Sequence, residues 1–84
     1  MVSLNEICRL FRLQLGIKQV NGEDYIQETL GTESIDLVNI VATIEERYEI
    51  EFEEEALAKM RTVADLHRLT EQHLGEGESD RAGA

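Results

Sequence analysis

A serine at the predicted start of a helix is the residue of this chain best placed to take part in chemistry. Ser34 follows Gly31, Thr32 and Glu33 and precedes an apolar run that begins at Ile35. A hydroxyl beside the positive end of a helix suits a phosphate ester. The alternative is that Ser34 is a helix-start residue whose hydroxyl bonds backbone N–H groups. Both interpretations stay open on these residues alone.

A self-activated nucleophile is disfavoured, because a serine needs a neighbouring base. His67 and His73 both fall in a later predicted helix, with no histidine near Ser34 in the sequence. We therefore predict no catalytic residue, and a minimal hydrolase is the least favoured function. If Ser34 is chemically used, another enzyme modifies it.

No metal site is predicted either. His67 and His73 do not share a helix face, so they do not form a zinc pair. The acidic residues of 51–55 lack the Asp, Asn and Gly spacing of a calcium-binding loop, which indicates a solvated acidic face. Cys8 lies on the apolar side of the first predicted helix, where we expect it to pack in the core.

Apolar spacing predicts four helices that together would position Ser34. The first is capped by Ser3 and Glu6, and the last opens with Thr62 and Asp65 and carries an apolar stripe as far as Leu74. The expected elements are helices over about 3–15, 34–49 and 54–59 and from 62 onward, with an irregular loop over 16–31. The loop should be anchored on the core by Tyr25, Ile26 and Leu30. This is an all-α fold, a small bundle of three longer helices and one short third helix with a long first loop.

The helix over 34–49 has two apolar faces. Its core stripe is predicted to be Leu37, Val41, Ile44 and Tyr48. The other strip suggests a docking surface edged by polar residues, and it comprises Ile35, Val38 and Ala42 with Asn39, Glu45 and Glu46. The alternative is that the short third helix covers this strip.

Size and charge bound the function. The chain has 84 residues, room for one small domain, which we place at 1–74 with a disordered tail at 75–84. Its formal net charge of −10 disfavours nucleic acids and anionic membranes and favours basic protein partners. One cysteine and the lack of an apolar run near about 20 residues predict a cytoplasmic protein without a membrane span. We expect a monomer.

The residues around Ser34 resemble the attachment motif of the acyl carrier proteins, usually Leu-Gly-x-Asp-Ser-Leu-Asp before an apolar helix. Residues 30–38 read LGTESIDLV, and Ser34 aligns with the modified serine. The resemblance continues in residues 15–17, 44–52 and 59–66, so that it covers about 3–74.

This resemblance implies that a phosphopantetheinyl transferase uses coenzyme A and magnesium to attach 4'-phosphopantetheine to Ser34. The thiol of that arm holds an acyl group as a thioester, and loading, condensing and acyl-transfer enzymes use it. The carrier itself is not an enzyme. The family's recognition helix corresponds here to Ile35, Asp36, Val38, Asn39, Ala42, Glu45 and Glu46.

Three positions depart from the family pattern. Glu33 replaces the usual aspartate and is a poorer helix cap, which makes Thr32 a candidate for the capping role. Asn39 and Arg47 stand where fatty-acid carriers usually have acids. We therefore favour polyketide or other specialised biosynthesis over fatty-acid synthesis. The alternative of another class is a noncatalytic acidic helical adaptor in which Ser34 is only a helix-start residue.

Overall fold

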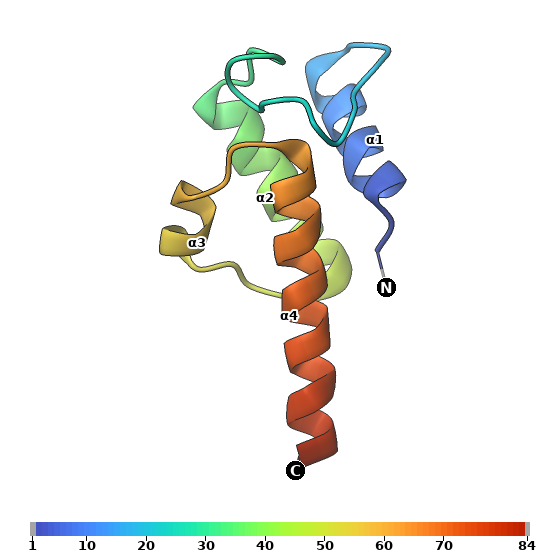
Figure 1. Ribbon diagram of the computed structural model, residues 1–84, viewed down its shortest axis with the longest axis vertical. Coiled ribbons are helices and arrows are strands. Elements are labelled where there is room, and N and C mark those ends of the chain that lie inside the picture. Colours follow the sequence, from blue (N-terminus) through green and yellow to red (C-terminus); the bar gives the residue numbers. More distant parts are fainter. Residues whose placement is uncertain (1, 84) are drawn as a thin grey trace.

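The structure is a computed structural model that describes residues 2–83, and the side chains of residues 2–75. Four helices make up this part of the chain: α1 (Leu4–Leu15), α2 (Ser34–Tyr48), α3 (Glu54–Ala58) and α4 (Val63–Gly83). In Figure 1, α1 runs opposite to α2 and α4, and α3 lies to one side of these three. The predicted all-α bundle is confirmed, and the described residues add only one isolated β-bridge, between Tyr25 and Thr62.

The core lies where α1 packs against both α2 and α4. Phe11, Ile44 and Leu66 are completely buried, one from each of these helices. Of the predicted core stripe of α2, Val41 and Ile44 are buried, whereas Leu37 and Tyr48 are half-buried. Buried residues that the pattern did not single out include Val2, Leu10, Val20, Ile40 and Thr70.

Side chains fix the starts of α1 and α4 as expected. The hydroxyl of Ser3 accepts a hydrogen bond from the Glu6 N–H at 3.1 Å. At α4, the Asp65 carboxylate accepts from the Thr62 N–H at 3.0 Å, and the Thr62 hydroxyl accepts from the Asp65 N–H at 3.2 Å. The bonds from the backbone N–H groups of Thr62 and Arg61 stabilise the carboxylate and lower the pKa of Asp65 below its ordinary value.

Backbone hydrogen bonds attach the first loop to the start of α4. Ile26 N–H donates to the Arg61 carbonyl at 2.8 Å, and Ala64 N–H donates to the Gly22 carbonyl at 2.8 Å. Ile26 is buried and Leu30 half-buried, as predicted for loop anchors. The prediction for Tyr25 was wrong, because its side chain is 46% exposed and Val20 is the other buried loop residue. Tyr25 instead holds the loop through its backbone, since its N–H donates a hydrogen bond to the Thr29 hydroxyl.

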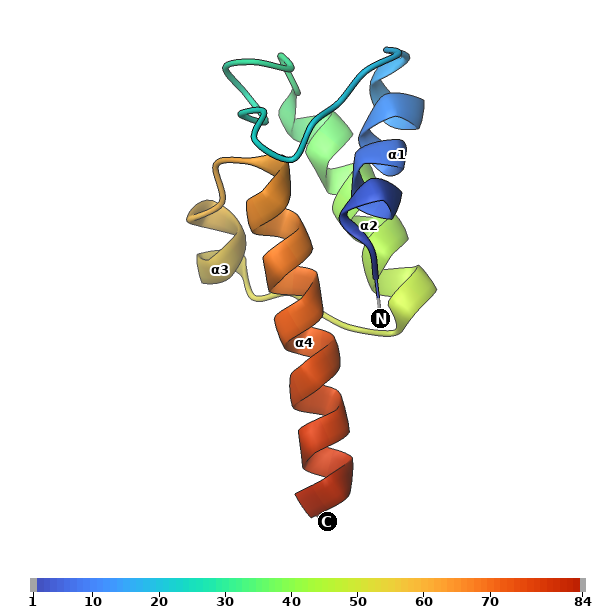
Figure 2. The same ribbon diagram turned by 45° about the vertical axis from the view of Figure 1, so that its right-hand side comes forward.

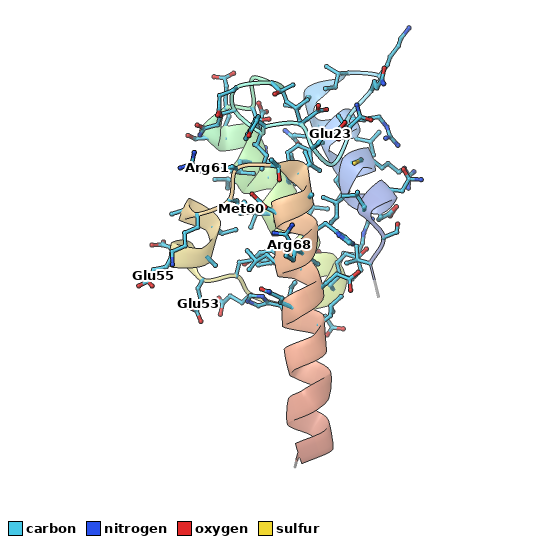
Figure 3. The ribbon with its side chains drawn as sticks, in the orientation of Figure 1. Glu23, Glu53, Glu55, Met60, Arg61 and Arg68 are labelled. Atoms are coloured by element: carbon cyan, nitrogen blue, oxygen red, sulfur yellow. The ribbon has the colours of Figure 1, made fainter. Side chains whose placement is uncertain are left out.

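The short helix α3 is attached to the bundle more loosely than the other three. It contributes no buried residue, whereas Phe52 in the segment before it is only 6% exposed. The ring of Phe52 stacks edge to face on His73 of α4, with centroids 5.1 Å apart. Figure 3 shows Glu53 and Glu55 on the outer side of α3, away from the bundle. Phe52 therefore anchors this region to the bundle.

At the C-terminal end, α4 continues to Gly83, beyond the predicted stripe that ends at Leu74. The tail at 75–84 was predicted to be disordered. Apart from Gly75, its side chains lie outside those that the structure describes, so the disorder stays a prediction. In the described part of the chain, no helix has the length and apolar character needed to cross a membrane.

Candidate functional site

Ser34 is the first helical residue of α2, and it is exposed. The helix cap is Glu33, which has extended backbone angles of φ −85° and ψ 163°. The expectation that Thr32 takes the capping role was therefore wrong. Gly31 has φ +65°, a left-handed conformation that side chains disfavour, and it turns the chain into this helix start. The hydroxyl of Ser34 thus lies one position inside the cap and faces solvent at the positive end of α2.

The carboxylate of Asp36 takes part in building this helix start. One of its oxygens accepts from the Glu33 N–H at 3.3 Å, and the other accepts from the side-chain amide of Gln14 at 3.3 Å. Since Gln14 belongs to α1, Asp36 also joins the two helices. Among the predicted partner residues, Asp36 thus has a structural role that the sequence did not indicate.

A groove of about 410 Å³ opens beside Ser34, between α2 and α3. Its walls are mostly apolar, with Val41 and Phe52 at the buried side. The groove is lined by Gln27, Thr32, Glu33, Ser34, Leu37, Val38, Val41, Ala42, Glu45, Phe52, Glu54 and Leu57. An attachment point on the rim of an apolar groove suits a flexible arm that carries an apolar or mixed group.

Thr32, two residues before Ser34, is a polar residue buried in the wall of this groove. Its side chain is 7% exposed, and its backbone N–H donates to the Ile26 carbonyl at 3.0 Å. Its hydroxyl oxygen is buried without a hydrogen-bond partner in the described structure. No local pattern around Thr32 indicates this burial, because burial of a loop residue depends on long-range packing.

The predicted docking strip lies on the surface of α2. Ile35 is 62% exposed and Val38 59% exposed, and Ala42 is also exposed. The alternative that α3 covers the strip was wrong, since Ile35, Val38 and Ala42 are exposed. Figure 2 shows α3 on the side of the bundle away from α1.

The polar residues at the edge of the strip differ in how free they are. Asn39 and Glu46 are exposed. Glu45 is half-buried, and its carboxylate accepts from the Phe52 N–H at 2.9 Å, which fixes the segment that follows α2. Arg47 donates to the Glu6 carboxylate at 3.1 Å and so joins α2 to α1. Glu46 is therefore the acid of this edge whose charge is most available to a partner.

Neither a metal centre nor a reactive thiol is formed by the described residues. No group of three or more His, Cys, Asp and Glu side chains in this part of the chain is arranged to hold a metal ion. His67 binds the Val2 carbonyl and lies 3.1 Å from a Glu71 oxygen, so it supports the fold. Cys8 is buried as expected, and burial raises the pKa of its thiol.

Comparison with known proteins defines the class to which this fold and site belong. The family model for the phosphopantetheine attachment site matches residues 5–69. The acyl carrier protein of Prochlorococcus marinus is 31% identical over 74 residues, covering 86% of this chain and 92% of the relative. That of Chlamydia felis is 34% identical over 65 residues, covering 75% of this chain and 83% of the relative.

Solved structures of acyl carrier proteins have the same fold as this chain. The holo acyl carrier protein of Geobacter metallireducens has a TM-score of 0.78 at 22% identity, covering 94% of this chain and 93% of that chain, and so shows the fold alone. The oxytetracycline acyl carrier protein has a TM-score of 0.76 at 26% identity, covering 92% of this chain and 86% of that chain.

The chain belongs to the acyl carrier proteins. Proteins of this family carry a covalently attached 4'-phosphopantetheine and are carriers, not enzymes, which confirms both predictions and displaces the adaptor alternative. The residues present fit this group, because an exposed hydroxyl at a helix start adjoins a mostly apolar groove. When bound, the group supplies a thiol on a long flexible arm for thioester formation.

Proposed function

We propose that Ser34 is the residue that bears 4'-phosphopantetheine and that the chain presents acyl groups on this arm to successive enzymes. The observation that carries the proposal is the exposed Ser34 hydroxyl at the first position of α2, on the rim of the groove. The exposed hydroxyl leaves room for a transferase to approach. The positive end of α2 favours the phosphodiester that forms there.

Intact-protein mass spectrometry tests the attachment. The unmodified chain is incubated with coenzyme A, magnesium and a broad-specificity phosphopantetheinyl transferase. We expect one phosphopantetheine mass to be added to the wild type and none to Ser34→Ala. The matched control is Ser3→Ala, which removes a helix-capping hydroxyl at the start of α1 and should load normally. Loading of Ser34→Ala would refute the assignment.

We further propose that partner enzymes dock on the exposed strip of α2. Its support is the combination of Ile35 and Val38, both exposed, with the free carboxylate of Glu46 at the edge. Basic enzymes would be attracted to this surface, and a small contact area gives the weak, salt-sensitive binding that a shuttle needs.

A charge placed in the strip should separate docking from folding. Val38→Asp should melt close to the wild type, because its side chain already lies in solvent, but should slow transfer by partner enzymes. The matched control is Leu13→Asp, which changes a residue of α1 that is 67% exposed. Equal loss of transfer in both variants would contradict a docking role for the strip.

For the pathway, we propose polyketide or related specialised assembly over fatty-acid synthesis. Support comes from Asn39 and Arg47, which make α2 less acidic than the resemblance to fatty-acid carriers implies, and from the likeness to the oxytetracycline carrier. The loaded chain is offered to the components of a fatty-acid synthase and to those of polyketide synthases. Efficient elongation by the fatty-acid enzymes alone would reverse this proposal.

A further inference from the structure

We infer that Glu45 is a positioning residue of the groove beside Ser34, whereas its neighbour Glu46 is a contact for docked enzymes. The carboxylate of Glu45 holds Phe52 in place as the inner wall of the groove, against which the arm and its acyl group rest. This inference rests on the proposed attachment at Ser34 and on the proposed docking strip. It adds no chemical step.

The turn that follows α2 is built on Glu45. Its carbonyl accepts hydrogen bonds from the Glu49 N–H and, at 3.1 Å, from the Ile50 N–H. Its carboxylate accepts from the Phe52 N–H at 2.9 Å. Glu49 has φ +55°, a left-handed conformation that side chains disfavour, so this turn depends on the bonds that hold it. One residue of α2 therefore fixes the direction of the chain over 49–52.

Phe52 joins this turn to the groove. Its side chain is buried, lines the groove and packs edge to face on the ring of His73. In Figure 1, the segment that contains it crosses from the end of α2 to the start of α3. The helix α3 begins soon after, at Glu54, and has neither a buried residue nor a side-chain hydrogen bond at its N-cap. The position of this side of the groove thus depends on how firmly Phe52 is held.

The charge of Glu45 strengthens its bond to Phe52. An ionised carboxylate is a stronger acceptor than a neutral oxygen, and the half-buried position of Glu45 reduces competition from water. A glutamine at this position would keep an acceptor oxygen without the charge, and an alanine would remove both. Substitutions at Glu45 should therefore loosen the wall in a graded way.

Glu46 is a residue of the same type that lies on a different surface. Consecutive residues of an α-helix point about 100° apart. Glu46 is exposed, and with Thr43 and Arg47 it lines a hollow that is separate from the groove. The two adjacent glutamates therefore allow the groove and the docking surface to be tested independently.

Amide hydrogen exchange of the unmodified chain tests the role of Glu45 in the groove wall. In Glu45→Ala, the Phe52 N–H should exchange about tenfold faster or more than in the wild type, because it loses a bond to a charged acceptor. In Glu45→Gln the rise should be about threefold, since a neutral acceptor bonds about half as strongly. The Ile26 N–H, which donates to the Arg61 carbonyl at 2.8 Å, should keep its rate in both variants. Glu46→Ala is the matched control and should change neither rate.

Loaded protein separates the groove from docking. The transferase is given octanoyl coenzyme A, so that the arm arrives with an octanoyl thioester, and mass spectrometry follows thioester hydrolysis at mildly alkaline pH. Glu45→Ala should hydrolyse severalfold faster than the wild type and keep the wild-type KM as a substrate of the transferase. Glu46→Ala should show the reverse, a KM raised severalfold and the wild-type rate of hydrolysis.

Any of four results would overturn the role of Glu45. An unchanged Phe52 exchange rate in Glu45→Ala would mean that the bond does not hold the wall. Equal acceleration at Ile26 would mean that Glu45 supports the whole fold. An unchanged rate of hydrolysis in Glu45→Ala, or a rise of its KM equal to that of Glu46→Ala, would remove the distinction between the two glutamates.

Failure of the proposed attachment gives a different result. No mass would then be added to the wild type or to either variant. The exchange rates of Phe52 and Ile26 are measured on the unmodified chain and do not depend on loading.

Discussion

The helices α1 and α3 show how differently two parts of one small domain can be held. From α1, Ile7, Cys8, Leu10 and Phe11 are buried, and the helix packs against both α2 and α4. From α3, no residue is buried, and a groove separates part of it from α2. The apolar face of α1 thus stabilises the fold, whereas α3 leaves space beside the attachment serine.

Length explains much of this difference. α1 has 12 residues, enough for a continuous apolar face, whereas α3 has five. A helix of little more than one turn cannot stabilise itself and depends on the contacts of its neighbours. In α3 these contacts come from half-buried Leu57 and from Met60 just beyond it.

The largest loss of stability is expected from a substitution in the buried face of α1. Phe11→Ala removes a completely buried ring and should cost about 3–5 kcal/mol of the free energy of unfolding, measured by urea denaturation. For a chain of this size, that is a large part of the total stability. Leu13→Ala on the same helix is the control and should change the stability by about 0.5 kcal/mol or less, because Leu13 is 67% exposed.

A smaller effect is expected from α3. Leu57→Ala removes a half-buried side chain that lines the groove and should cost about 1 kcal/mol. Urea denaturation of this variant beside Phe11→Ala gives the comparison directly. A loss as large as that of Phe11→Ala would mean that α3 is part of the main core, contrary to its lack of buried residues.

The smallest loss of stability is expected at the start of α4, where Asp65 makes hydrogen bonds that Glu53 does not make at the start of α3. The lowered pKa of Asp65 means that its charged form stabilises the folded state. This contribution to stability is fully present at pH values above the ordinary pKa of 3.8. It is lost as the pH falls through the lower pKa that Asp65 has in the folded state. Asp65→Asn should therefore be less stable than the wild type near pH 7, by about 0.5 kcal/mol, and the two should converge in acid.

Glu53→Gln is the matched control for this measurement. Glu53 is the N-cap residue of α3, but its side chain makes no capping hydrogen bond. Its replacement should leave the stability near pH 7 unchanged. A pH-independent difference between Asp65→Asn and the wild type would contradict the electrostatic explanation.

The sequence was sufficient for the helices and for the position of Ser34, because both depend on local signals. Ser3, Thr62 and Asp65 cap the helices at the predicted places, and apolar spacing gave the buried faces of α1 and α2. The loop was predicted less well: Tyr25 proved exposed and Val20 buried. Which loop side chain enters the core depends on contacts with residues far along the chain, which local spacing does not encode.

The site shows the same limit. Exposure of Ile35 and Val38 followed the helical wheel, but the structural bonds of Asp36 and Glu45 did not, because they join residues brought together by the fold. The buried state of Thr32 was also missed. Its neighbours Gly31 and Glu33 suggested only a helix cap, whereas tertiary packing determines its hydrogen bonding.

The contact between the first loop and the start of α4 bears on how far sequences of this family can diverge. Its bonds from Ile26 to Arg61, from Val63 to Asp24 and from Ala64 to Gly22 join main-chain groups only. Most substitutions leave a main-chain donor or acceptor unchanged, with proline the exception for a donor. Mutation can therefore replace many of these side chains while the loop that leads to Ser34 stays in register. This gives a physical reason why the fold persists in a relative at 22% identity.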